Sequence, residues 1–208
     1  MKRRTLLSLA VVGRPFASAM VWVGIASALG ALAAAWLRPE GAQAEAAEVL
    51  IIGDSLAVGM KPFLREMIPD RKVTVDARHG RTTPQGMEAL RLDLQYTAPQ
   101  TVVISLGTND GSNVKVFGDR VRRMLLEIDP DTCVVWPAII RPARKGDYRG
   151  LNKVLRREAR RDRRMTVIPW DRMVAKGTVS LRDGIHPNAD GYRFRAYVTA
   201  AAVARGCG

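Results

Sequence analysis

A serine, an aspartate and a histidine stand in short motifs that together could carry out nucleophilic chemistry. Ser55 belongs to the sequence GDSL at residues 53–56, and Asp183 and His186 belong to DGIHP at residues 183–187. A serine hydroxyl is a weak nucleophile that needs a general base, and the base needs a group that orients it. A carboxylate three residues before an imidazole can accept its Nδ1–H and stabilise the imidazolium. These three residues are therefore candidates for nucleophile, orienting acid and base.

An amide side chain follows a buried strand in the sequence GTND at residues 107–110. Asn109 could donate a hydrogen bond to an oxyanion, which needs donors held in place beforehand. Each motif also has a simpler interpretation: Ser55 as a helix N-cap, Asn109 as a turn residue, and Asp183 as a capping aspartate beside a surface histidine. All three motifs fall at predicted junctions of strands and helices, and this joint occurrence favours the catalytic interpretation.

The elements that must position these residues alternate between apolar strands and amphipathic helices. Strands are predicted over residues 48–52, 72–77, 101–106, 132–139 and 165–168. Helices are predicted over residues 55–68, 84–96, 114–128, 148–163 and 189–204. Such alternation indicates a parallel sheet covered on both faces. We therefore expect an α/β fold, a three-layer flavodoxin-like doubly wound sheet of about five parallel strands, with its site beyond the carboxyl ends of the strands.

With these motifs, the chain resembles the SGNH (GDSL) hydrolases over about residues 48–205. The resemblance implies that Ser55 is the nucleophile and that Asp183 and His186 complete a catalytic triad. It further implies an oxyanion hole made of the Ser55 N–H, the Gly80 N–H and the Asn109 amide. For Gly80, which lies in the sequence HGRTT, a plain loop glycine is the simpler interpretation.

A looser resemblance links the chain to the SGNH domains of membrane acyltransferases that modify envelope sugars. It covers residues 134–138, 148–155 and 167–171. The chain departs from those proteins because it contains at most one candidate membrane span. A built-in pathway for an acyl donor is therefore not expected from this resemblance.

The first 44 residues have the composition of a targeting segment. Met1–Arg4 is basic, residues 17–37 carry no charge, and residues 42–44 (AQA) fit a cleavage site. The uncharged run is also long enough to span a bilayer, so residues 1–44 are either a signal peptide or a membrane anchor. Both alternatives predict export of a hydrolase domain at residues 45–208 to the periplasm or cell surface, with membrane contact through the N-terminal segment.

Charge and cysteine content narrow the possible partners. Residues 1–44 contribute +4 of the formal net charge of +13, so the remaining residues carry +9. A basic domain favours anionic partners, although a solvated arginine-rich surface is the simpler explanation. No aromatic residues interleave with the basic run, so nucleic-acid binding is not expected. Cys133 and Cys207 fit no zinc-ligand spacing, and both a disulfide and two unpaired thiols remain open.

Several enzyme classes are disfavoured by missing motifs. A lipase-type α/β-hydrolase would carry Gly-x-Ser-x-Gly, whereas Ala57 stands two residues after the candidate nucleophile. The glycine fingerprint of dinucleotide-binding domains is missing after the first strand. Ligands for a catalytic metal are also missing, so we expect neither metal nor cofactor.

The expected activity is that of an extracytoplasmic serine esterase that hydrolyses short-acyl esters through an acyl-enzyme on Ser55. Its substrate would be a small ester or an acylated envelope polymer, such as an O-acetylated polysaccharide. Short connections after Gly80 and Asn109 leave no segment for a lid, which favours short acyl groups. Two alternatives stay open: an acyltransferase to an envelope sugar, and a catalytically idle envelope-binding module that uses a basic helix. The residues of that helix are Lys153, Arg156, Arg157, Arg160 and Arg161.

Overall fold

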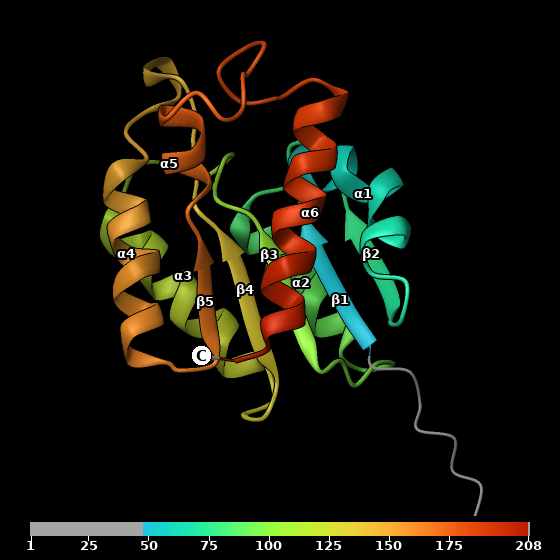
Figure 1. Cartoon of the computed structure of the whole chain (residues 1–208). Coiled ribbons are helices and arrows are strands. Elements are labelled where there is room, and N and C mark those ends of the chain that lie inside the picture. Colours follow the sequence, from blue (N-terminus) through green and yellow to red (C-terminus); the bar gives the residue numbers. More distant parts are fainter. Residues whose placement is uncertain (1–47, 208) are drawn as a thin grey trace, which may run out of the picture. The chain divides into compact units, whose positions relative to one another are not determined.

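A five-stranded parallel sheet organises residues 48–207, which are the residues described by the computed structural model. The strands are β1 (Glu48–Gly53), β2 (Lys72–Ala77), β3 (Thr101–Ser105), β4 (Cys133–Pro137) and β5 (Met165–Ile168). They lie in the order β2-β1-β3-β4-β5, and all neighbours pair in parallel (Figure 1). This order is that of a flavodoxin-like doubly wound sheet, so the predicted fold class is confirmed.

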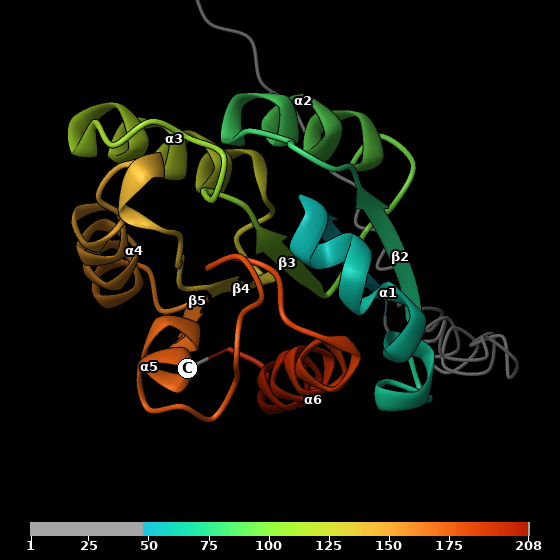
Figure 2. The same ribbon diagram turned by 90° about the horizontal axis from the view of Figure 1, so that it is seen from above.

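Helices cover both faces of the sheet, as the view from above shows (Figure 2). One face is covered by α2 (Thr83–Asp93), α3 (Val114–Glu127) and α4 (Arg149–Arg161). The other face is covered by α1 (Ser55–Met67), the short α5 (Trp170–Ala175) and α6 (Ala189–Arg205). The structure is therefore a three-layer α/β/α arrangement.

Alternate side chains of each strand supply two separate apolar cores. In β1, Leu50 and Ile52 belong to the core under α2, α3 and α4, whereas Val49 and Ile51 belong to the core under α1 and α6. All four side chains are fully buried. Because successive residues of a strand point to opposite faces, a strand covered on both sides is an uninterrupted apolar run in the sequence.

The chain leaves the neighbouring strands β1 and β3 toward opposite faces of the sheet. β1 continues into α1, and β3 continues into α3 on the other face. In doubly wound sheets, a crevice that binds ligands opens at this point, beyond the carboxyl ends of the two strands. The segments that follow the two strands carry Ser55 and Asn109, so the topology brings both residues to the same crevice.

The structure adds two elements to those predicted. A 3-10 turn (Ala143–Lys145) follows β4, and α5 follows β5 almost directly. Both are too short to show the apolar periodicity from which a helix is predicted. The helix predicted over residues 84–96 begins one residue earlier, at Thr83, and ends at Asp93.

A disulfide joins Cys133 to Cys207, with their Cα atoms 5.1 Å apart. Of the two alternatives that the sequence leaves open, the bonded pair is the one present. The bond connects the first residue of β4 to the chain just after α6, at the edge of the sheet where the strands begin.

Three of the five basic residues predicted to form a cationic face on α4 are paired with acids. Arg156 forms a salt bridge of 2.6 Å with Asp171, and Arg157 and Arg161 lie 3.0 and 3.5 Å from the carboxylate of Glu158. The buried Glu158 side chain thus offsets part of the helix's positive charge. This pairing weakens the interpretation of α4 as a free cationic face for binding an envelope polymer.

No helix within residues 48–207 is long and apolar enough to cross a membrane. The signal peptide or anchor predicted for residues 1–44, with its uncharged run at residues 17–37, lies outside the described residues.

Candidate active site

Ser55 is the first residue of α1 and follows β1 through a tight turn. Asp54 is the N-cap of this helix, since its side chain accepts a hydrogen bond of 2.9 Å from the Leu56 N–H. The interpretation of Ser55 as a mere N-cap is therefore wrong, and its hydroxyl is free for another role. The turn also requires Gly53, because a Cβ at this position would lie 2.2 Å from the Ala57 side chain.

The structure brings Ser55, His186 and Asp183 into one hydrogen-bonded chain. Ser55 Oγ lies 2.8 Å from His186 Nε2, and His186 Nδ1 lies 2.8 Å from Asp183 Oδ2. These distances are short enough for the imidazole to exchange a proton with the serine hydroxyl while the carboxylate fixes its orientation. Ser55 and His186 are 131 residues apart in sequence and meet only because the fold brings them together.

Backbone hydrogen bonds hold the Asp183–His186 turn in place. Asp183 Oδ1 accepts from the His186 N–H at 2.8 Å and from the Ile185 N–H at 3.0 Å. These bonds, together with the bond from the His186 ring, hold the pKa of Asp183 well below its usual range. Asp183 is therefore ionised at every pH at which the protein would work. It caps its own turn and orients the histidine at the same time, so the two interpretations of this residue are compatible.

Asn109 lies in the segment that follows β3, beside Asp54, the residue before Ser55. Its Nδ2 donates to the Arg81 carbonyl at 3.2 Å and lies 3.5 Å from Asp54 Oδ2. The side-chain amide therefore bridges the segments after β1, β2 and β3. An amide in this position can redirect one N–H toward an oxyanion formed at Ser55.

Gly80 lies in an exposed turn between β2 and α2. Its φ of 71° falls in the region that glycine adopts without strain, and the turn is closed by a bond of 3.2 Å from the Arg81 N–H to the Arg78 carbonyl. Arg81 anchors this turn through two bonds of 2.7 Å, to the carbonyl and the carboxylate of Asp76. Arg81 follows Gly80, and its carbonyl accepts a hydrogen bond from the Asn109 side-chain amide. The two predicted oxyanion-hole residues, Gly80 and Asn109, therefore lie on adjoining loops.

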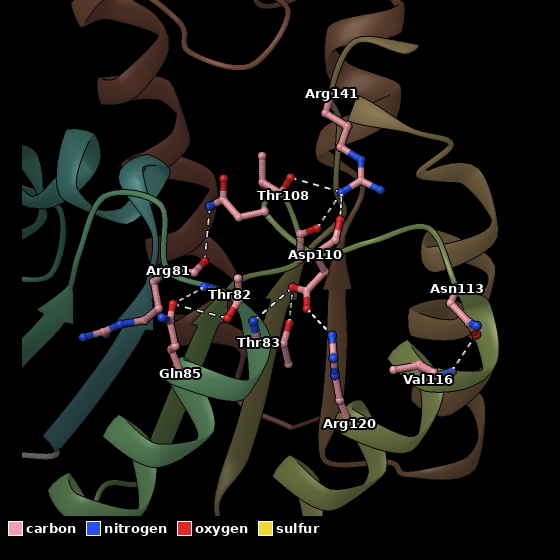
Figure 3. A network of polar contacts seen from close by, with 12 residues as sticks. Arg81, Thr82, Thr83, Gln85, Thr108, Asp110, Asn113, Val116, Arg120 and Arg141 are labelled. Atoms are coloured by element: carbon pink, nitrogen blue, oxygen red, sulfur yellow. Dashed lines mark hydrogen bonds and ion pairs between the residues drawn. The ribbon is translucent and has the colours of Figure 1, made fainter. Parts of the chain in front are cut away.

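Arg141 fixes the loop that carries Asn109. Its buried guanidinium donates to the Thr108 carbonyl at 3.1 Å, to the Gly107 carbonyl at 3.3 Å, and to the Asp110 carbonyl (Figure 3). The carbonyls on both sides of Asn109 therefore share one cation. The sequence gives no signal for this role, because Arg141 is one of 33 lysines and arginines.

Asp110 ties the same loop to two helices (Figure 3). Its side chain is fully buried and accepts from the Thr83 N–H at 3.0 Å and the Thr83 hydroxyl at 2.6 Å, at the start of α2. Its other oxygen accepts from Arg120 of α3 at 2.7 Å. Asp110 closes the GTND motif, but its position beside Asn109 does not reveal which helices it contacts.

Two buried groups of opposite charge lie next to the first turn of α1. Burial raises the pKa of Asp54 to about 6, and the Leu56 N–H and the positive charge of Arg195 oppose this rise. Arg195 donates to Ser105 Oγ at 3.0 Å and lies over the Trp170 ring, 4.7 Å from its centroid. Burial lowers the pKa of Arg195 to about 10, so the group stays charged at neutral pH.

Metal ligands do not cluster in this part of the chain: within residues 48–207, no group of three or more His, Cys, Asp or Glu side chains could hold an ion. The groups at the carboxyl edge of the sheet are instead a hydroxyl, an imidazole, a carboxylate and hydrogen-bond donors. This set supports nucleophilic acyl transfer.

Comparison with known sequences identifies one family. The model of the GDSL-like lipase/acylhydrolase family matches residues 51–194, a span that includes Ser55, Gly80, Asn109, Asp183 and His186. No curated protein sequence matches the chain.

Solved structures of ester-processing enzymes share the fold. The catalytic domain of Streptococcus pneumoniae peptidoglycan O-acetyltransferase A is 22% identical, with a TM-score of 0.61, over 77% of this chain and 91% of that chain. A lipase/acylhydrolase from Enterococcus faecalis is 20% identical, with a TM-score of 0.67, over 76% and 95%. An acetyl xylan esterase is 16% identical, with a TM-score of 0.62, over 75% and 99%. At such identities the likeness shows a common fold.

Proposed function

This chain belongs to the GDSL-like lipase/acylhydrolase family and is a serine ester hydrolase, and from this premise we propose that it cleaves short-acyl esters through an acyl-enzyme on Ser55. The observation that carries the proposal is the unbroken chain of two 2.8 Å contacts from Ser55 through His186 to Asp183. Each group in this chain has the partner that its catalytic role requires.

The first half of the reaction forms the acyl-enzyme. His186 Nε2 takes the proton from Ser55 Oγ as the oxygen attacks the ester carbonyl. The tetrahedral oxyanion accepts hydrogen bonds from the N–H groups of Ser55 and Gly80 and from the Asn109 amide. To reach the oxyanion, the Asn109 amide gives up its hydrogen bond to the Arg81 carbonyl. His186 then gives the proton to the leaving alcohol, and the bond between the carbonyl carbon and the alcohol oxygen breaks.

The second half releases the acid. A water molecule takes the place of the alcohol, and His186 accepts its proton as the water attacks the acyl carbon. The bond to Ser55 breaks, and the proton returns to its Oγ. Throughout the cycle, the ionised Asp183 stabilises the positive charge that His186 carries between transfers.

Two observations support short acyl groups on a bulky alcohol. Only short connections follow β2 and β3, and the longer segment after β4 is held by Arg141 through its bond of 3.1 Å to the Gly146 carbonyl. The connection between α5 and α6 is longer, but it already holds Asp183 and His186 and is closed by the β-bridge from Leu181 to Pro187. None of these connections is thus left to close over a long acyl chain, of which each methylene would contribute roughly 0.8 kcal/mol when buried. We expect kcat/KM to be highest for acetyl to butyryl esters and lower for palmitoyl esters.

The substrate we favour is an O-acetylated polysaccharide of the cell envelope, met outside the cytoplasm. The composition of residues 1–44 supports export, and so does the Cys133–Cys207 disulfide, because disulfides persist in oxidising compartments. The likeness to an acetyl xylan esterase supports an acetylated polymer. The likeness to a peptidoglycan O-acetyltransferase favours one alternative, transfer of the acyl group to an envelope sugar.

One labelling experiment tests the nucleophile. The Ser55→Ala variant should lose both hydrolysis of para-nitrophenyl acetate and covalent labelling by a fluorophosphonate, with an unchanged circular dichroism spectrum. Ser180→Ala, a change at an exposed serine of the loop after α5, should keep both activities. If Ser55→Ala retained labelling, another residue would be the nucleophile.

A second measurement distinguishes a hydrolase from a transferase. It compares the amount of acetate released with the amount of acetyl transferred to an added oligosaccharide.

A further inference from the structure

A pocket of about 400 Å³ lies beside the catalytic histidine. It is lined by His79, Arg182, Asp183, His186 and Tyr192. Its lining includes His79, which precedes Gly80 in the chain, but neither Ser55 nor Asn109. The pocket therefore lies between the turn that carries Gly80 and the turn that carries His186.

The chemistry of the proposed reaction decides which half of the ester this pocket receives. The carbonyl oxygen must face Asn109, whereas the leaving oxygen must come within hydrogen-bond reach of His186 Nε2, which protonates it. A pocket lined by the His186 ring therefore holds the alcohol half of the substrate. This assignment rests on the proposed function.

One cation, Arg182, and one anion, Asp183, face the pocket, and of the two only Arg182 has a side chain without a hydrogen-bond or salt-bridge partner within residues 48–207. Arg182 is exposed, and no carboxylate within residues 48–207 forms a salt bridge with it. The one acid in the lining, Asp183, already accepts hydrogen bonds from two backbone N–H groups and from the His186 ring. An anionic ligand would thus meet an unpaired guanidinium, an imidazole and a phenol hydroxyl.

Backbone contacts fix Arg182 relative to the catalytic histidine. The Arg182 N–H donates to the His186 carbonyl at 2.8 Å, and a β-bridge joins Leu181 to Pro187. The guanidinium therefore extends from the same closed loop as the imidazole. Arg182 and Tyr192 both line the pocket.

The opposite wall of the pocket is equally fixed. The Tyr192 ring packs against Gly59 of α1 so closely that a Cβ at position 59 would lie 2.1 Å from a ring carbon. His79 belongs to the turn closed by the bond from the Arg81 N–H to the Arg78 carbonyl. A pocket whose walls are already in place loses little conformational freedom when it binds a ligand.

We propose that this pocket is a subsite for the leaving alcohol and that it selects alcohols carrying an anionic group, a carboxylate or a phosphate, through Arg182 with His79 and Tyr192. The net charge of +9 after residue 44 would draw such substrates toward the domain as a whole. Arg182 is a specificity residue in this proposal, since it takes no part in the proton transfers. The expected substrate is thus an ester of an acidic sugar or a phosphorylated polyol.

The test compares acetyl esters that differ only in the charge of the alcohol. The acetyl ester of para-hydroxybenzoate carries a carboxylate on its leaving group, that of para-hydroxyphenyl phosphate carries a phosphate, and that of para-hydroxybenzamide is neutral. In Arg182→Gln, kcat/KM should fall about tenfold for the charged esters, mainly through KM, and by less than twofold for the neutral ester. The larger of the two losses identifies the anion. Added salt should reduce the advantage of the charged esters in the wild type.

Two controls separate this subsite from general electrostatics and from loop damage. Arg205→Gln removes the same charge at the far end of α6, roughly 25 Å along the helix, and should leave the preference intact. Mono-para-nitrophenyl succinate, with its carboxylate on the acyl half, should lose less than twofold in Arg182→Gln. Equal losses for all esters in Arg182→Gln would overturn the subsite while leaving the esterase in place. An esterase that remained fully active after Ser55→Ala would instead overturn the proposed function.

Discussion

Arg141 should control turnover without touching the substrate. Its guanidinium binds the carbonyls of Gly107, Thr108 and Asp110, which surround Asn109 in the sequence. A lysine in its place is a point charge on a flexible stem and cannot bind three carbonyls in a fixed geometry. In Arg141→Lys, we therefore expect the loop to relax and the Asn109 amide to lose its alignment with the oxyanion.

The magnitude follows from what Asn109 can contribute. Removal of one oxyanion donor costs roughly 10²–10³-fold in kcat, or about 3–4 kcal/mol, which is the loss expected for Asn109→Ala itself. Arg141→Lys displaces that donor without deleting it, so kcat should fall by roughly 10- to 100-fold with KM nearly unchanged. Because Arg141 acts through Asn109, the double variant should be no slower than Asn109→Ala alone. Initial rates with para-nitrophenyl acetate give kcat and KM for the two single variants and the double variant.

Arg164 provides a matched control at the other edge of the sheet. Its guanidinium donates to the carbonyls of Leu125, Ile128 and Asp129 at 3.2, 3.2 and 2.7 Å, but no catalytic residue lies in that loop. Arg164→Lys should destabilise the protein in urea unfolding and leave kcat unchanged. Normal kcat in Arg141→Lys, or losses that simply multiply in the double variant, would refute the positioning role.

Two further predictions concern stability. The folded state holds a proton on Asp54 up to about pH 6, whereas the unfolded carboxyl loses it near 3.8, so wild-type stability relative to Asp54→Asn should fall by about 2 kcal/mol as pH rises from 4 to 7. Urea unfolding at several pH values measures this difference, and a pH-independent difference would contradict the buried charge. Replacing Cys133 and Cys207 by serine opens a loop with a sequence separation of 74 and should cost roughly 4 kcal/mol, read as a lower Tm, with kcat unaltered. A large loss of kcat would mean that the bond also shapes the site.

The sequence was sufficient to predict the five strands and the long helices, and to single out side chains that the fold brings together, for identifiable physical reasons. The residues 102–104 of β3 are apolar because they are buried on both faces, and Asn109 comes within 3.5 Å of Asp54, the neighbour of Ser55, because parallel strands share one carboxyl edge. Local patterns suffice for such features. His186 reaches Ser55 across 131 residues, and only the DGIHP motif signals this contact.

Contacts that depend on three-dimensional distance were not predictable. Arg141 has no pattern that separates it from the other basic residues, because its role comes from carbonyls that belong to another loop. The pairing of Cys133 with Cys207 requires their Cα atoms to lie close together, which spacing in the sequence does not show. The short helix α5 begins right after Pro169 and contributes one fully buried residue, Trp170, too little for a periodic signal.

The disulfide also divides the catalytic groups between two parts of the chain. The covalent ring that it closes, from Cys133 to Cys207, contains Asp183 and His186, whereas Ser55 lies outside it. If a protease cuts the exposed backbone around Gly177, the histidine-bearing fragment stays attached to the serine-bearing one. Tethering keeps the effective concentration of the two halves high, so they can remain docked after the cut. A nicked molecule should therefore stay active until it meets a reductant.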